Sequence, residues 1–177
     1  MKFAHVNLVA RDWRKLAAFY ERVFGCAPVP PERDLRGAWL QKATGLAGAR
    51  IRGMHLRLPG HGKNGPTLEI FEYRPEAAAA DKAVNRHGFG HIAFAVEDVE
   101  ATRRAVLEAG GGEVGALTTV PVAGAGTITF AYLTDPEGNI LVEKGRVAVF
   151  YTSGLGFKEH ADTWDLARCE IGLEYLK

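Results

Sequence analysis

Two histidines and two glutamates recur at matching places in the two halves of this 177-residue chain. His5 opens the segment HVNLVARDW, and His91 opens the similar segment HIAFAVEDV. Later in each half, Glu69 stands in the segment LEI and Glu143 in the corresponding segment VEK. A duplication that repeats one imidazole and one carboxylate supplies the ligands for a metal ion at a pseudo-twofold axis.

The chemistry of these four side chains favours a divalent cation. A buried carboxylate is costly without a partner, and a divalent ion balances two carboxylates while accepting two neutral imidazoles. A ligand set of two nitrogens and two oxygens, without a thiolate, suits Zn, Ni, Co, Mn or Fe(II). Catalysis by such an ion requires one or two open positions for water or substrate oxygens.

The elements that must position these residues follow from the hydrophobic pattern. Residues 2–9 alternate as a strand that places His5 on one face, and Thr67–Tyr73 forms the strand that carries Glu69. Asp12 stands where an N-cap is wanted, and the helix that follows ends at Gly25. We expect the four ligands to lie within strands, on the inward face.

The second half repeats this plan, and each half is predicted to fold as βαβββ. The predicted second-half elements are a strand at Gly90–Val96, a helix capped by Asp98 from Val99 to about Ala109, a strand at Thr127–Leu133, a turn at Asp135–Asn139 and a strand at Ile140–Glu143. In the first half, Ala49–Leu58 is a further strand, and Pro28–Gly48 is predicted to be a loop, with Trp39 and Leu40 in a short strand. Long loops often cover a site, so this loop is the candidate cover.

Four segments result. Residues 1–75 form the first module, 76–86 the linker, 87–145 the second module and 146–177 a C-terminal extension. Within the extension, Lys158–Lys177 is predicted to form an amphipathic helix.

Composition excludes several classes of function. The chain is 47% hydrophobic and 24% charged, which is typical of a globular protein, and its formal net charge is +1. This charge gives no reason to expect nucleic acid or a membrane surface as a partner, and the small basic clusters at 50–52 and 103–104 are expected to solvate the surface. No window is apolar enough to span a membrane. The two cysteines form no metal or redox pattern, so we expect a cytoplasmic protein.

The phrases GHIAFAVEDV at 90–99 and YLTDPEGN at 132–139 resemble the vicinal oxygen chelate superfamily, which includes glyoxalase I, acyl-CoA epimerases, extradiol dioxygenases and antibiotic resistance proteins. The resemblance covers about residues 3–145. It implies an α+β fold in which paired βαβββ modules form an open, cup-like, eight-stranded sheet around a divalent metal. The metal ligands it implies are His5, Glu69, His91 and Glu143. It also implies a homodimer and a small-molecule substrate.

The ligand set is most similar to that of glyoxalase I. This similarity implies a lyase or isomerase that abstracts a proton next to a metal-bound carbonyl, with Glu143 as the first candidate base and Glu69 as the second. Glyoxalase I usually has an arginine for glutathione where this chain has Val9.

Three alternatives are an acyl-CoA epimerase, an Fe(II) extradiol dioxygenase using His5, His91 and Glu143, and a metal-free protein that binds a drug or metabolite. Of the histidines without a repeat partner, His55 is the best candidate to line the cavity.

Overall fold

The computed structural model describes residues 1–78, 82–122 and 126–145. The elements in chain order are β1 (His5–Val9), α1 (Trp13–Phe24), β2 (Ala27–Arg36), α2 (Ala38–Thr44), β3 (Arg50–Arg57), β4 (Thr67–Arg74), β5 (Ile92–Val96), α3 (Val99–Glu108), β6 (Gly112–Glu113), β7 (Thr118–Val122), β8 (Gly126–Thr134) and β9 (Ile140–Gly145). The predicted α+β class and the repeated modules are therefore confirmed.

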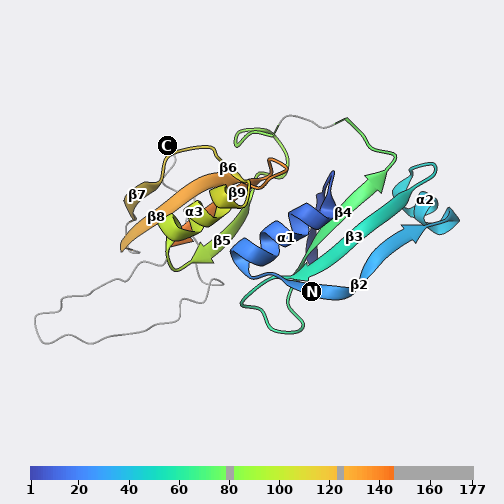
Figure 1. Ribbon diagram of the computed structural model, residues 1–177, viewed down its shortest axis with the longest axis horizontal. Helices are drawn as coiled ribbons and strands as arrows, with labels where there is room; N and C mark the ends of the chain where they lie inside the picture. Colours follow the sequence, from blue (N-terminus) through green and yellow to red (C-terminus); the bar gives the residue numbers. More distant parts are fainter. Residues whose placement is uncertain (79–81, 123–125, 146–177) are drawn as a thin grey trace, which may run out of the picture. The chain divides into compact units, whose positions relative to one another are not determined.

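Each module contains its own mixed sheet (Figure 1). The first has the strand order β1-β4-β3-β2, with β1 and β4 parallel. The second has the order β5-β9-β8-β6, with β7 also paired to β8 and with β5 and β9 parallel. The two sheets contain four and five described strands, which is one strand more than the eight predicted. The additional strand arises because the region between α3 and β8 contributes two short strands, β6 and β7, instead of one.

The two long helices begin in the same way in the two modules. Oδ1 of Asp12 accepts the backbone N–H of Lys15 at 3.2 Å, and Oδ1 of Asp98 accepts that of Ala101 at 2.9 Å. Both predicted N-caps are confirmed. The first helix ends at Gly25, whose φ of 65° is the left-handed conformation that glycine adopts without strain.

The main core lies between these helices and one face of each sheet. Leu16 and Tyr20 of α1 and Val106 of α3 are fully buried in one continuous cluster. The rings of Phe24 and Phe94 stack with their centroids 4.0 Å apart, which joins α1 to the second sheet. A smaller cluster under α2 contains Leu40, Ala49, Ile51 and Phe71. Apart from this small cluster, the sheet faces opposite α1 and α3 are therefore left for other roles.

Two sequence predictions about the first module are wrong. Most of the predicted loop Pro28–Gly48 is strand β2 followed by helix α2, and Trp39 and Leu40 belong to that helix rather than to a strand. The three prolines in β2 indicated a loop, because proline has no N–H to donate. However, β2 is an edge strand, where missing N–H donors are tolerated.

None of the helices in the described residues is long and apolar enough to cross a membrane. The predicted helix Lys158–Lys177 lies outside the described residues.

Candidate metal centre

His5 and Glu69 meet on one face of the first sheet. Nδ1 of His5, the first residue of β1, lies 3.4 Å from Oε1 of Glu69 on β4. Glu69 is paired with Asn7 in the parallel register, so His5, two residues before Asn7, shares its face. The structure thus brings together the two predicted ligands of the first module.

A third side chain, His55 on β3, joins this pair. His55 lies directly opposite Glu69 in the antiparallel register, and its Nδ1 is 3.4 Å from the same Oε1. The exposed fractions of the His5, His55 and Glu69 side chains are 51%, 25% and 14%, so the shared carboxylate is the least accessible of the three. Sequence reasoning missed this contact because His55 has no counterpart in the second module.

Burial sets the charge state of His55. Its pKa is lowered mainly by burial, with smaller lowering effects from Arg33 and His5, against a raising effect from Glu69. A lowered pKa keeps the imidazole uncharged near neutral pH, and an uncharged imidazole has a nitrogen lone pair for a metal or a proton.

Glu143 lies on the opposite face of its sheet from the one predicted. On β9 it is paired with Phe94 on one side and with Ala131 on the other, and both neighbours belong to the helix-covered core. Its relative accessibility is 0%, and neither carboxylate oxygen has a hydrogen-bond partner. Burial raises the pKa of Glu143 from about 4.5 to about 7.

The two glutamates therefore differ by one residue in register. Glu69 pairs with the residue two after His5, whereas Glu143 pairs with the residue three after His91. Val142 is the residue paired two after His91, at Ala93. Because side chains alternate along a strand, this single-residue offset moves the carboxylate to the other face. Among the described residues, neither Glu143 nor His91 joins His5 and Glu69 in a group that could hold a metal ion.

Val142 instead lines a cavity of about 250 Å³ on the second sheet. The other lining residues are Val120, Val122, Ile128, Phe130, Tyr132 and Lys144. His91, which is exposed and directly precedes β5, contacts the Tyr132 ring edge-on with the centroids 5.7 Å apart. This predicted ligand therefore lies beside an apolar cavity with one basic side chain.

Within the described ranges, no three His, Cys, Asp or Glu side chains already stand in an arrangement that holds a metal ion. The donor types at the first sheet nevertheless fit one, since two imidazoles and a carboxylate are ligands for Zn, Ni, Co, Mn and Fe(II).

The predicted turn at Asp135–Asn139 does more than reverse the chain. Asp135 is buried and accepts hydrogen bonds from the Tyr20 hydroxyl, at 2.9 Å, and from two backbone N–H groups of the turn. Oε1 of Glu137 accepts the backbone N–H groups of Arg11 and Asp12. The turn thus fixes the start and the middle of α1, which places β1 and His5. Sequence reasoning identified the turn but not this role.

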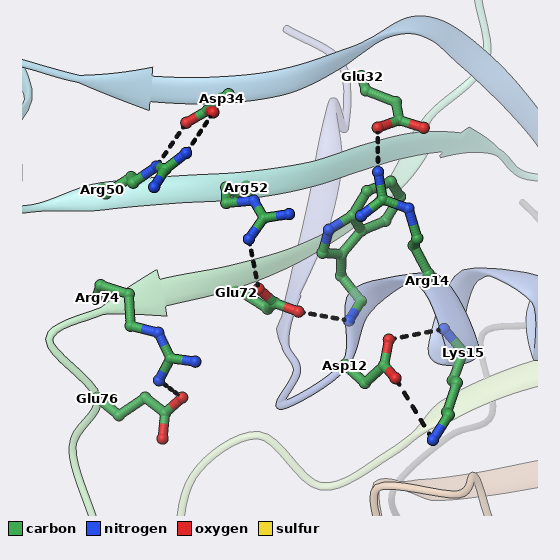
Figure 2. A network of polar contacts seen from close by, with 11 residues as sticks. Asp12, Arg14, Lys15, Glu32, Asp34, Arg50, Arg52, Glu72, Arg74 and Glu76 are labelled. Atoms are coloured by element: carbon green, nitrogen blue, oxygen red, sulfur yellow. Dashed lines mark hydrogen bonds and ion pairs between the residues drawn. The ribbon is translucent and has the colours of Figure 1, made fainter.

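Two basic residues of the first sheet, Arg50 and Arg52, are paired with neighbouring carboxylates (Figure 2). Arg50 makes two hydrogen bonds to Asp34, at 2.7 and 2.6 Å, and Arg52 lies 4.0 Å from Glu72. In the second module, Arg103 and Arg104 both contact Glu100. The four arginines of the two basic clusters are thus each paired with a neighbouring carboxylate.

Comparisons with known proteins agree with this architecture. The family described as the Glyoxalase/Bleomycin resistance protein/Dioxygenase superfamily matches residues 2–142. A glyoxalase family protein from Bacillus cereus has a TM-score of 0.65 and 18% identity, over 84% of this chain and 94% of that one. A glyoxalase/bleomycin resistance protein/dioxygenase family enzyme from Burkholderia phytofirmans PsJN has a TM-score of 0.52 and 16% identity, over 83% and 100%. Among curated proteins, none matches this chain.

Proposed function

We propose that this chain, which belongs to the Glyoxalase/Bleomycin resistance protein/Dioxygenase superfamily, is a metal-dependent, glyoxalase I-like lyase or isomerase of a small molecule. The observation that carries the proposal is the meeting of His5 and Glu69, 3.4 Å apart, on the sheet face that α1 does not cover. A largely buried carboxylate held by an imidazole is a pair of donors suited to a divalent ion.

The proposed ligands are His5 and Glu69, with His91 from the second module. Glu143 is left out of this narrower set because both of its carboxylate oxygens lie in the core. A bound Zn, Ni, Co, Mn or Fe(II) ion would polarise a substrate carbonyl and make the adjacent C–H more acidic.

The protein side chains perform the remaining steps. Glu69 takes the proton, since it is the accessible one of the two glutamates. The apolar cavity beside His91 receives the hydrophobic part of the substrate, and Lys144 is its one basic group among the described lining residues.

An Fe(II) extradiol dioxygenase is the second candidate. Without Glu143, the proposed set contains two histidines and one carboxylate, which is the ligand composition of non-haem Fe(II) oxygenases. The acyl-CoA epimerase and the metal-free binding protein have no comparable observation in their favour. The homodimer and the cytoplasmic location stay predictions.

The test is the metal content of the purified wild type and of Glu69→Gln and Glu143→Gln variants, prepared without chelator. We expect about one divalent ion per chain in the wild type and in Glu143→Gln, and none in Glu69→Gln. The loaded wild type is then assayed for isomerisation of hemithioacetals and for ring cleavage of catechols. A wild type that takes up none of the five metals would refute the proposal in favour of a binding protein.

A further inference from the structure

Three neighbouring strands bring three donor groups to one point of the first sheet. Because β4 lies between β1 and β3, Glu69 has His5 on one side and His55 on the other. Both Nδ1 atoms lie 3.4 Å from the same oxygen, Oε1. Within the part of the chain that the structure describes, these are the two ion-pair contacts of the Glu69 carboxylate.

We infer that His55 is an additional ligand of the metal ion, so that the first module supplies three donors, His5, His55 and Glu69, beside His91. This inference rests on the proposed function, because it concerns the same ion. It gives a physical reason for the difference between the modules: the second sheet presents Val142 where the first presents Glu69, and a nitrogen from β3 supplies the donor that this position lacks.

The surroundings of His55 hold its ring in place. The ring packs edge-on against Phe71, with the centroids 5.5 Å apart and the planes at 75°. Phe71 in turn belongs to the small core beneath α2. Gly53 makes room for this packing, because a Cβ at position 53 would lie 2.4 Å from Cδ1 of Phe71. A ligand whose orientation is fixed before binding loses less entropy when it binds.

His5, rather than His55, is the ligand that would change its side-chain orientation when the ion binds. Its side chain is 51% exposed, at the beginning of β1, so it can rotate about its side-chain torsions toward an ion. When an ion binds, the two imidazoles would contact the metal instead of Oε1 of Glu69, which both of them contact in this structure. His55 and Glu69 form the prearranged half of the site, and His5 closes it.

The experiment measures Co(II) binding to the full chain after removal of metal, for the wild type, His55→Ala, His55→Gln and His87→Ala. Affinity is measured by competition with a chelator, and coordination is followed by visible absorption. His87 is an exposed loop histidine and serves as the matched control. We expect at least a tenfold loss of affinity and an altered spectrum in both His55 variants, with His87→Ala like the wild type.

Pulsed EPR of the Cu(II)-loaded proteins then counts coordinated imidazoles, and we expect one fewer in His55→Ala than in the wild type. Glutamine can still donate a hydrogen bond to Glu69, so wild-type affinity in His55→Gln would show that His55 only orients the carboxylate and would overturn the inference. So would an unchanged spectrum and affinity in His55→Ala. A wild type that binds no Co(II) or Cu(II) would instead refute the proposed function itself.

Discussion

In the first module, Glu69 of the last strand pairs with Asn7 and contacts His5 and His55. In the second module, Glu143 of the last strand pairs with Phe94 and lies in the core. The helices that precede these strands have the same N-cap, the same length to within two residues and the same buried face. The two modules thus share their helix starts, but the register of the last strand differs between them by one residue.

The difference shows how sensitive a strand is to register. On a helix, an offset of one residue rotates a side chain by about 100°, but on a strand it moves the side chain to the opposite face. For Glu143 the consequence is a carboxylate whose two oxygens are buried without a partner. Leaving such a group unpaired costs about 1–3 kcal/mol, more if it is charged.

The largest effect on stability is expected for the turns that precede the last strands, β9 and β4. Asp135 holds the turn before β9 and the Tyr20 hydroxyl, while the exposed Asn64 occupies the turn before β4. We expect Asp135→Ala to lower the free energy of unfolding by about 4 kcal/mol, because it leaves the buried Tyr20 hydroxyl and three partly buried N–H donors unpaired. Asn64→Ala should change it by less than ~0.5 kcal/mol. Urea denaturation measures both, and equal effects would mean that the two turns are equivalent.

The buried Glu143 should make stability depend on pH. The folded chain keeps this proton up to about pH 7, while the unfolded chain releases it near the ordinary value of 4.5. The folded state therefore binds more protons between these values, and stability falls as pH rises through them, by roughly 3 kcal/mol in total. Glu143→Met should remove this decline.

The measurement is the difference in unfolding free energy between Glu143→Met and the wild type at pH 5 and at pH 8. The variant should gain on the wild type as the pH rises. A difference that is the same at both pH values would mean that Glu143 is solvated or paired in solution.

The same comparison explains which features the sequence could predict. Helix starts depend on local signals, and both Asp12 and Asp98 were identified from them. The assignment of Glu143 depended on aligning two short strands, where an error of one residue is invisible in the sequence but reverses the face. The contact of His55 with Glu69 arises from the pairing of β3 with β4, and no periodicity within either strand contains that information.

Moving the carboxylate by one residue should make the second module resemble the first. The double variant Val142→Glu, Glu143→Val places a carboxylate at the position that corresponds to Glu69, on the face that lines the cavity with Tyr132. We expect Co(II) to bind at least tenfold tighter, equivalent to ~1.4 kcal/mol, because a further charged donor becomes accessible beside His91.

Val120→Glu is the matched control for this variant. It adds the same charge to the same cavity, but from β7. Chelator competition compares the three proteins. Equal gains in both variants would show that the added charge, rather than the register, determines the affinity.

The smallest effect is expected where the modules agree. Asp12 and Asp98 each accept one backbone N–H of the first helical turn, at 3.2 and 2.9 Å, so replacing either by alanine should cost about 1 kcal/mol. Denaturant unfolding of the two single variants measures this cost, and their double variant should show the sum, since the two caps have no common partner among the described contacts. A much larger cost for Asp12→Ala would mean that the hydrogen bonds from the backbone N–H groups of Arg11 and Asp12 to Glu137 depend on the cap. The second module would then stabilise the start of α1, and the two helices would not be equivalent at their first turns.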